Sequence, residues 1–392
     1  MIMLSYYLLL FAISLACTWW IFKKVLKIAV MKNIVDNPDA RKLQRIPVPV
    51  LGGVAVFFGM IVALTATRLT HDTYSLFAVM GVMTIMLYVG TMDDIISLTP
   101  KARFIIEILV VLLLIYSNNY SLDDFHGLWN VEDVSHWISI PLTVFACVGI
   151  INAVNLIDGV NGLSSGYCIM ACTVFGTAFY VSGDHDATSL ASAAVGALIP
   201  FLCHNVFGRK SKMFIGDGGT LLMGTVLSAM VIGAVNNQSP LAAYVGPDFG
   251  VIPFVLAVLA IPVFDCLRVM LFRIIKGSSP FYPDRTHLHH LLFDMGFSHV
   301  GTSITEIMLN VIIIVVWWIS YRLGASIDMQ LYIVVSLAML FTFGFYGFVR
   351  FHEKKNTRLF QLMQAVGRKT HLGHKPWWQG FREFLDQNID TE

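Results

Sequence analysis

The feature that most restricts this chain is a series of long apolar runs. Each run of about 16–24 residues is long enough to cross the roughly 30 Å of bilayer hydrocarbon as a helix. The runs recur along most of the 392 residues, and the chain is 56% hydrophobic and only 13% charged. A soluble protein carries about twice that charged share, and the strands of a β-barrel alternate between apolar and polar residues. The sequence therefore predicts an all-α polytopic membrane protein and excludes an ordinary soluble fold.

Polar breaks divide these runs into about eleven candidate transmembrane helices. If the N-terminus lies outside the cell, all of the 26 Lys and Arg residues except Arg68 and Arg322 fall on the inside. This bias is the positive-inside pattern of membrane proteins. It predicts an outside N-terminus, a cytoplasmic C-terminus and a location in the cell inner (plasma) membrane. The predicted helices begin near residues 3, 50, 74, 103, 138, 162, 188, 218, 249, 301 and 329.

The C-terminal segment differs in composition from the rest of the chain. Residues 1–350 form one multispan transmembrane domain, which carries the candidate catalytic residues, without an internal repeat or a linker. Residues 351–392 mix basic with aromatic and aliphatic side chains, as does an amphipathic cytoplasmic segment on an anionic leaflet. A disordered solubilising tail is the alternative.

The net charge of +1 does not indicate nucleic acid as a partner. The six cysteines all lie in apolar runs and are expected to be buried free thiols.

Candidate catalytic residues concentrate in the inside loops rather than at the middle of the predicted spans. Asp93 and Asp94 close the third span. A carboxylate left in hydrocarbon costs roughly 2.5–3.5 kcal/mol, so this pair is expected to face water or a cation. Pairing with a divalent ion explains both residues. A solvated loop end held by Lys101 and Arg103 is the alternative.

A short loop rich in Asn, Asp and Gly joins the fifth and sixth predicted spans. Asn155, Asp158 and Asn161 supply hard oxygen ligands that suit Mg²⁺, and Gly159 lets the backbone approach a bound group. A tight turn between two helices explains the same composition. Taken by itself, this loop leaves both interpretations open.

The third cluster begins the eighth predicted span. Gly216 and Asp217, with two further glycines, form a glycine-rich helix N-terminus directly after the basic segment 209–212. Such a helix end attracts phosphate. The order Gly-Lys-Ser/Thr of a Walker motif is missing, so hydrolysis of a nucleoside triphosphate is not supported.

The longest inside loop, 276–290, carries Arg285 and a His-x-His-His block at 287–290. These histidines could bind Zn²⁺ or contact phosphate and sugar hydroxyls, and solvated surface histidines are the alternative. No cysteine lies nearby and the other clusters supply oxygen, so magnesium suits the site better than zinc. Asp265 and Arg268, three residues apart in the ninth span, are expected to form a structural ion pair.

Together the loops supply paired carboxylates, amide oxygens, a helix end that attracts phosphate, and a basic histidine loop. Mg²⁺-dependent phosphoryl transfer uses these groups, because positioning and charge neutralisation provide most of its catalysis. A cytosolic nucleotide-linked phosphate and a lipid phosphate as the two substrates explain why such an enzyme lies in a bilayer. A transporter of a lipid-linked or nucleotide-linked sugar is the rival, but its charged residues are expected inside the spans. The predicted spans of this chain contain few ionisable residues, chiefly Glu107, Asp265 and Glu306.

From about Val35 to about Phe297 the sequence resembles the polyprenyl-phosphate N-acetylhexosamine-1-phosphate transferases. Residues 279–290 are most similar to the branch that transfers N-acetylglucosamine-1-phosphate from UDP-N-acetylglucosamine to undecaprenyl phosphate. Leu288 interrupts the three consecutive histidines that are usual in the branch handling the muramoyl-pentapeptide. The shared motifs, in order, are Asp36-Asn37-Pro38, Arg41-Lys42, Pro49-Val50-Leu51-Gly52-Gly53, Asp93-Asp94, Asn155-Leu156-Ile157-Asp158-Gly159, Gly216-Asp217 and the histidine block.

The resemblance implies an active site built from cytoplasmic loops and a specific reaction. The lipid phosphate attacks the β-phosphorus of the UDP-sugar, releases UMP and begins a lipid-linked cell-envelope glycan. The same reaction with another UDP-sugar, including the muramoyl-pentapeptide, is the alternative. The membrane setting also makes a homodimer an expectation, although no interface is visible in the sequence.

The resemblance also implies a role for each site residue. Asp93 deprotonates or orients the lipid phosphate, and Asp94 supports the metal or a substrate phosphate. Many bacterial members have Asp where this chain has Asn161, so that position is expected to donate a hydrogen bond rather than act as an acid. The implied set is Asp93, Asp94 and Asp158 for catalysis, Asn155 and Asp217 for Mg²⁺ (or Mn²⁺), and Lys42, Asn161, Arg285, His287, His289 and His290 for substrate.

Overall fold

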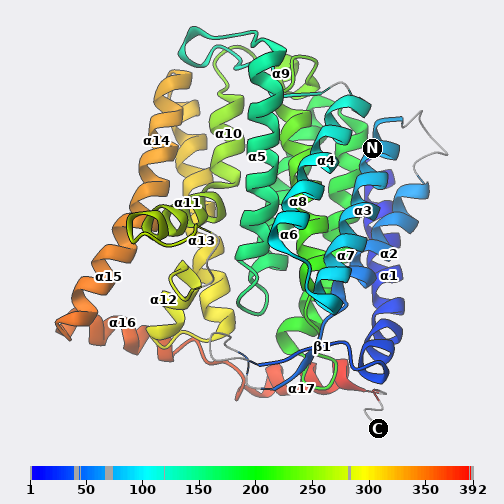
Figure 1. The fold of residues 1–392 in the computed structure, drawn as a ribbon, viewed down its shortest axis with the longest axis vertical. Coiled ribbons are helices and arrows are strands. Elements are labelled where there is room, and N and C mark those ends of the chain that lie inside the picture. The colour runs from blue at the N-terminus through cyan, green and yellow to red at the C-terminus, as the bar shows by residue number, and fades with distance from the viewer. Residues whose placement is uncertain are drawn as a thin grey trace.

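The computed structural model describes residues 2–38, 44, 46–66, 74–118, 120–280, 284–387 and 389. Helices make up most of this part of the chain (Figure 1). Its one sheet is an antiparallel pair, β1 (Val35–Asp36) and β2 (Val48–Pro49). The predicted all-α class is therefore confirmed. The six cysteines are free thiols, and four of them are buried.

Eight helices of the described residues are long and apolar enough to cross a membrane, and a bent pair raises this number to nine. The polytopic class is confirmed, but the predicted number of about eleven is higher. The difference arises because α2 (Gly52–Thr65) has only 14 residues and α4 (Pro100–Asn118) carries three charged side chains. The eight are α1 (Ile2–Met31), α3 (Tyr74–Ile96), α5 (His136–Leu156), α6 (Leu163–Ser182), α7 (His185–Phe207), α8 (Gly216–Val235), α13 (His299–Arg322), and the run of α14 (Ile327–Met339), η3 (Leu340–Gly344) and α15 (Phe345–Lys354).

The span predicted to start near residue 249 is broken into α10 (Val251–Val258) and α11 (Ala260–Ile275), which are bent by 74°. Pro262 explains the break, because proline has no N–H to bond the carbonyl four residues earlier. That carbonyl, of Val258, instead accepts hydrogen bonds from Tyr167 Oη at 2.7 Å and from Asn310 Nδ2 at 2.9 Å. As a result, α11 crosses the bundle rather than continuing along it (Figure 1).

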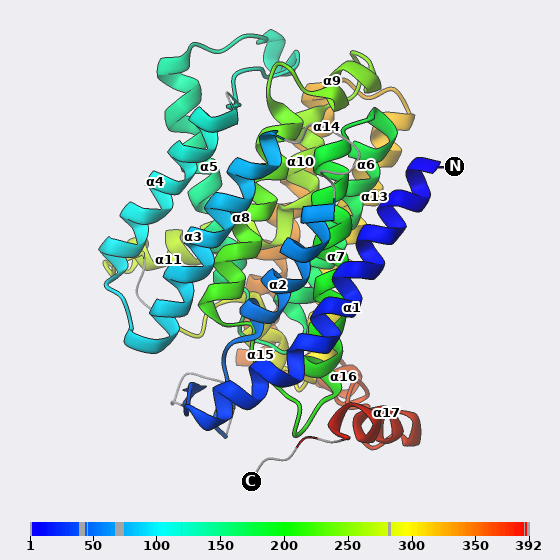
Figure 2. The same ribbon diagram turned by 90° about the vertical axis from the view of Figure 1, so that its right-hand side faces the viewer.

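The central helix of the bundle is α8, and most of its 20 residues are buried. It packs against α2, α3, α5 and α7, as Figures 1 and 2 show. Glycines allow two of these contacts. A Cβ at Gly53 of α2 would overlap Gly219, and one at Gly90 of α3 would overlap the carbonyl of Asp217. Small residues at helix crossings let the two backbones touch, so the N-terminus of α8 lies directly between α2 and α3.

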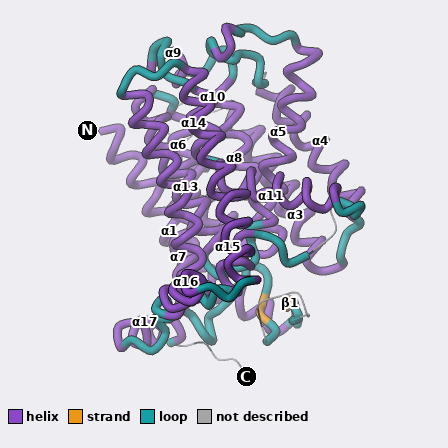
Figure 3. Tube along the Cα trace, turned by 90° about the vertical axis from the view of Figure 1, so that its left-hand side faces the viewer, coloured by secondary structure: helices purple, strands orange, loops and turns teal. Residues whose placement is uncertain are grey.

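The loops with the predicted site residues gather at one end of the bundle, the lower end in Figure 1. The same end holds β1, α12 (Leu288–Asp294), α16 (Arg358–Arg368) and α17 (Pro376–Asp386). At the opposite end lie α9 (Pro240–Val245) and the connection with η2 (Leu128–Asn130). Figures 2 and 3 show the N-terminus of α1 nearer this opposite end. The first helix therefore runs toward the end that holds the predicted site residues.

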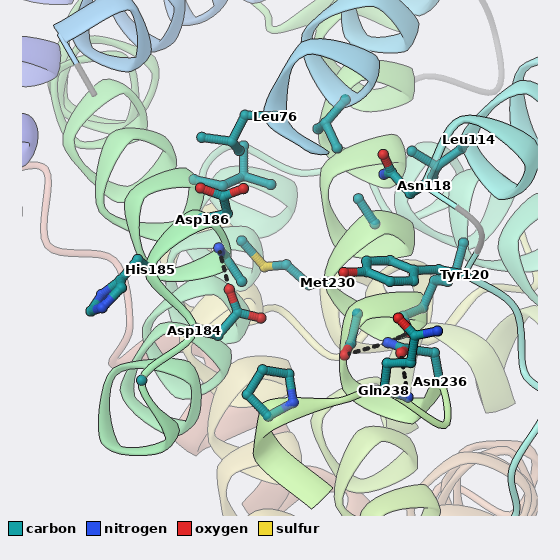
Figure 4. Close-up of a pocket in the computed structure, with 18 residues that line it drawn as sticks. Leu76, Leu114, Asn118, Tyr120, Asp184, His185, Asp186, Met230, Asn236 and Gln238 are labelled. Carbon is teal, nitrogen blue, oxygen red and sulfur yellow. Dashed lines mark hydrogen bonds between the residues drawn. The ribbon is translucent and has the colours of Figure 1, made fainter. Parts of the chain in front are cut away.

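A second cavity, of about 490 Å³, lies at the end opposite the clusters and is lined by α3, α4, α7 and α8 (Figure 4). Two of its polar side chains complete helix ends. Asp184 is the N-cap of α7 and accepts a hydrogen bond from the Ala187 N–H at 3.0 Å. Asn236 follows α8 and donates from Nδ2 to the carbonyl of Ile232 at 2.9 Å. Helix capping therefore explains the position of these two residues.

The contact of α3 with α8 gives a matched pair of glycine substitutions. We expect Gly90→Ala to lower the melting temperature of the detergent-solubilised protein, since the new methyl group meets the backbone of Asp217. Overpacking of this kind costs about 1–3 kcal/mol. Gly81→Ala on the same helix is the control, because Gly81 is exposed and a Cβ there meets no described atom within 4 Å. Equal melting temperatures for the two variants would contradict this packing.

Candidate active site

One cavity, of about 810 Å³, brings the four predicted clusters together. It is lined by α3, α4 and α11, by the α5–α6 and α7–α8 loops, and by the loop before α12. Arg285 is not part of its lining and forms an ion pair with Asp294 at 3.6 Å, and Lys42 lies outside the described residues. The predicted site residues that do line the cavity are Asp93, Asp94, Asn155, Asp158, Asn161, Asp217, His287, His289 and His290.

The guanidinium of Arg103, on α4, lies at the centre of the polar network. Its Nη1 is 3.4 Å from Asp93 Oδ2 and 3.8 Å from Asp217 Oδ2. Its Nη2 donates to Asn155 Oδ1 at 3.0 Å, and Asn155 Nδ2 donates to Asp217 Oδ1 at 2.7 Å. Side chains from α3, α5 and α8 thus meet at one cation. From the sequence, Arg103 is expected only as a partner of the Asp93 and Asp94 loop end, and the structure shows its contact with Asp93.

Two further side chains fix the position of Arg103. Glu107, one turn further along α4, accepts from Arg103 Nε at 3.1 Å and from Asn152 Nδ2 at 2.5 Å. Asn152 Oδ1 also accepts from Arg103 Nη2, at 3.2 Å. The spacing of Arg103 and Glu107 is visible in the sequence as an i, i+4 pair. The contact of Asn152 with Arg103 is not visible in the sequence, because only the packing of α5 against α4 brings Asn152 to this network.

Asp94 caps the N-terminus of α8. Its Oδ1 accepts from the N–H of Asp217 at 3.0 Å, and its Oδ2 accepts from the N–H of Gly218 at 3.2 Å. Free N–H groups at a helix start favour such a carboxylate. The helix end that the sequence offers to a phosphate is therefore taken by a carboxylate of the same chain. In this structure Asp94 holds Asp217 in place through the Asp217 backbone N–H.

The loop between α5 and α6 is held from several sides. Asp158 lies open to the cavity and accepts a hydrogen bond from Ser164 Oγ. Asn205 bridges two loops of the site, because its Oδ1 accepts from the Gly162 N–H at 2.8 Å and its Nδ2 donates to the Met213 carbonyl at 3.0 Å. Gly162 has a φ of +79°, a conformation that favours glycine. This loop is thus both a tight helix–helix turn and part of the cavity wall.

Asp265 anchors the histidine block. It forms the predicted ion pair with Arg268, at 2.6 Å, and its other oxygen lies 2.8 Å from His287 Nδ1. Arg268 also donates to the carbonyl of Thr286 at 2.6 Å. With Nδ1 bonded to the carboxylate, His287 Nε2 is buried and has no hydrogen-bond partner among the described residues. The broken helix α11 therefore supplies the residues that orient the block.

The other two histidines are neutral at physiological pH. Burial, with the charge of neighbouring histidines, holds the pKa of His289 well below its usual range. Burial, with the nearby Arg285, lowers the pKa of His290 to about 4. Neutral imidazoles offer one donor and one acceptor each rather than a positive charge. The block is therefore suited to hydrogen bonding with hydroxyls and phosphate oxygens, and the interpretation as solvated surface histidines does not fit its burial.

A second arginine holds the outer part of this loop. Arg273 Nη2 lies 2.9 Å from Asp284 Oδ1, and its Nη1 donates to the carbonyl of Pro280 at 2.6 Å. Burial acts to raise the pKa of Asp284, but hydrogen bonds from Arg273 and Thr286 outweigh it and lower the pKa to about 2. The ion pair therefore persists across the physiological pH range.

The oxygen atoms around Arg103 fit a hard divalent cation. Asp93, Asn155 and Asp217 present carboxylate and amide oxygens to one region of the cavity. Among the described residues, no three His, Cys, Asp or Glu side chains form a closed metal cage. Mg²⁺ commonly binds through one or two carboxylates and completes its shell with water and substrate phosphate. This open arrangement fits Mg²⁺ better than Zn²⁺, which needs several close nitrogen or sulfur ligands.

Known proteins similar in sequence to this chain are glycosyl and sugar-phosphate transferases. Glycosyl transferase family 4 matches residues 76–235. The undecaprenyl-phosphate alpha-N-acetylglucosaminyl 1-phosphate transferase of Yersinia pestis is 30% identical over 278 residues, 69% of this chain and 73% of the relative. A probable undecaprenyl-phosphate N-acetylglucosaminyl 1-phosphate transferase of Bacillus subtilis (strain 168) is 30% identical over 290 residues, 74% of this chain and 78% of the relative. The Escherichia coli (strain K12) transferase is 30% identical over 282 residues, 69% and 72% of the two chains.

The protein is therefore an enzyme of the phosphoglycosyl transferase class. The chain belongs to glycosyl transferase family 4 and is similar, within it, to the undecaprenyl-phosphate N-acetylglucosaminyl 1-phosphate transferases. The family and branch predicted from the motifs are confirmed, and the transporter alternative is wrong.

The burial of His290 predicts a dependence of stability on pH. Its folded-state pKa of about 4 lies below the ordinary value of about 6.5, so the unfolded chain binds the proton more tightly. The stability that depends on neutral His290 is fully present above about pH 6.5, and it is lost as the pH falls toward 4. Between pH 7 and pH 5 we expect the wild type to lose about 2 kcal/mol more unfolding free energy than His290→Gln.

Unfolding of the solubilised protein at several pH values measures this difference. His374→Gln is the control, since His374 is exposed and lies in the C-terminal tail. Parallel pH profiles for the wild type and His290→Gln would show that His290 is not buried as a neutral group.

Proposed function

We propose that this enzyme transfers N-acetylglucosamine-1-phosphate from UDP-N-acetylglucosamine to undecaprenyl phosphate in a Mg²⁺-dependent reaction that releases UMP. The observation that carries the proposal is the convergence of four loops on one cavity around Arg103. The names of the relatives support the sugar phosphate and the lipid acceptor. The product, a lipid-linked sugar pyrophosphate, would begin a cell-envelope glycan.

We assign Asp93 to the lipid acceptor. Its Oδ1 accepts from the Leu98 N–H at 2.7 Å, while its Oδ2 faces Arg103. In the proposed reaction, Asp93 takes the proton of the lipid phosphate or orients that phosphate for attack. An oxygen of the lipid phosphate forms a bond to the β-phosphorus of the donor. The bond from this phosphorus to the bridging oxygen breaks, and its electron pair leaves with UMP.

The donor pyrophosphate fits a cavity with cationic side chains. Arg103, Lys101 and Lys212 line it, and positioned cations stabilise the charge that develops during phosphoryl transfer. Asp217 and Asn155 would hold Mg²⁺, which supplies further charge neutralisation on the pyrophosphate. His289 and His290, both neutral, are available for hydrogen bonds to the sugar and phosphate. From the family resemblance, we assign Asp158 and Asn161 to contacts with the nucleotide end of the donor.

The lipid acceptor requires an apolar path to the cavity. Phe104 of α4 and Met270 of α11 belong to the cavity lining. On the same two helices, Leu109 and Leu271 are exposed. Both helices pack against α5, and each has apolar side chains both in the cavity lining and on its exposed face. This arrangement supports a substrate with a long hydrocarbon chain.

We place the cavity at the cytoplasmic face, with the N-terminus outside and residues 351–392 on the inner leaflet. The positive-inside bias supports this orientation, as does the cytosolic origin of a nucleotide-linked sugar. In the tail, α16 and α17 expose apolar side chains such as Leu362, Val366 and Trp377 beside basic residues. Helices of this composition lie at the headgroup level of anionic membranes.

The proposal is tested with purified protein, undecaprenyl phosphate, Mg²⁺ and radiolabelled UDP-N-acetylglucosamine. We expect label in an organic-extractable lipid, an equal amount of UMP, and loss of both on addition of EDTA. If the enzyme transfers sugar phosphate from another UDP-sugar but not from UDP-N-acetylglucosamine, the assignment of the donor sugar is wrong and the reaction type stands. Release of UDP instead of UMP would refute the bond assignment.

In the same assay, Asp217→Asn should lower turnover about 100-fold or more, because the amide removes a carboxylate assigned to the metal. Its melting temperature should stay close to that of the wild type. Glu132→Gln, at the opposite end of the bundle, controls for loss of an acidic residue. Full activity of Asp217→Asn would refute the metal assignment.

A further inference from the structure

The C-terminal helices form a strap, residues 358–387, across the lower end of the bundle (Figure 1). The strap contacts α1, through Lys23 and Trp19, and two further segments near the site. Near the end of α16 it reaches the turn between α12 and α13, and with α17 it reaches the loop between α7 and α8. Lys212 of the α7–α8 loop lines the site cavity, as does His299, which follows the α12–α13 turn directly.

Asp386 makes the contact with the α7–α8 loop. Its Oδ1 accepts from the Ser211 N–H at 2.9 Å and from Ser211 Oγ at 2.7 Å, and the Arg209 N–H lies 3.2 Å from both oxygens. One carboxylate thus holds three donors of one short loop. The next residue, Lys212, lines the cavity, and the loop continues into Asp217.

Aromatic packing supports this first contact. The ring centroids of Trp378 and Phe381 lie 4.4 Å and 5.0 Å from that of Phe207, the last residue of α7. Arg382 Nε donates to the carbonyl of Phe207 at 3.2 Å. The helix that presents Asp386 is therefore itself fixed on the bundle.

Thr370 makes the second contact. The Ser298 N–H donates to Thr370 Oγ1 at 2.8 Å, and Ser298 Oγ donates to the Thr370 carbonyl at 2.8 Å. Ser298 is also the N-cap of α13 and accepts from the Gly301 N–H at 3.0 Å. His299 follows it directly, lines the cavity, and accepts from the Asn161 N–H at 3.4 Å. This contact therefore fixes the start of α13 beside the histidine block.

We propose that the strap is a positioning element of the donor site, in which Asp386 and Thr370 hold the α7–α8 loop and the α12–α13 turn at the correct separation. The proposal rests on the proposed function, since Lys212 and the histidines are there assigned to the donor. Misplacement by about 1 Å of groups that position a substrate can reduce a rate about 100-fold. Asp93, on α3, serves the acceptor, so disturbing the strap should affect the two substrates unequally.

The test compares Asp386→Ala with Glu383→Ala. Both remove one acidic residue from α17, but Glu383 is exposed and forms no hydrogen bond or ion pair with the described residues. We expect Asp386→Ala to lower kcat/KM for UDP-N-acetylglucosamine about tenfold or more, with the KM for undecaprenyl phosphate changed less than about twofold. Asp386→Asn should recover part of the loss, because its amide oxygen still accepts hydrogen bonds. Glu383→Ala should match the wild type.

Amide hydrogen exchange gives a readout that does not depend on the reaction. In Asp386→Ala, the amides of Arg209 and Ser211 should exchange at least about tenfold faster than in Glu383→Ala. Thr370→Val should do the same for Ser298. Unchanged exchange, or wild-type kinetics in Asp386→Ala, would overturn the positioning role. If the wild type transfers no sugar phosphate, the proposed function fails, while the exchange comparison still decides whether the strap holds the loops.

Discussion

The site depends on the burial of the N-terminus of α8 at the centre of the bundle. A helix start has free N–H groups that need acceptors, and the surrounding apolar helices offer few. Asp94 of α3 satisfies two of them, and the glycines of α2 and α3 let the backbones come close enough for this contact. The same contact places Asp217 at the cavity, so packing and the position of a functional carboxylate are fixed together.

The carboxylates at the cavity create an electrostatic problem that Arg103 solves. Asp93 and Asp217 lie near each other at the cavity, where their like charges repel. Arg103 lies between them and is held by Glu107 and Asn152. In the proposed reaction the divalent ion and the donor pyrophosphate bind in this region. Arg103 and the oxygens around it therefore also determine where the charges of the metal ion and the pyrophosphate lie.

The motifs predicted residues that meet in one cavity, whereas hydropathy predicted more membrane spans than the described residues contain. The clusters around Asp93, Asn155, Asp217 and the histidines all line one cavity, because each consists of residue types with a defined chemistry. The span count depended on hydropathy, which does not show that Pro262 breaks a helix or that α2 is short. The sequence suggested the contacts of Arg103 with Asp93 and Glu107. It did not suggest those with Asn152, Asn155 and Asp217, which lie far away in the sequence.

The sequence by itself determined the helical membrane class, the enzyme family and the residue types of the site, because apolar length and short motifs are local properties of the chain. The tertiary structure alone decided which groups meet. It assigned Asp94 to the N-terminus of α8, joined Asp265 to His287, and tied the C-terminal strap to two loops of the cavity. These contacts join residues distant in sequence, and only the packing of the helices and the satisfaction of buried polar groups bring them together.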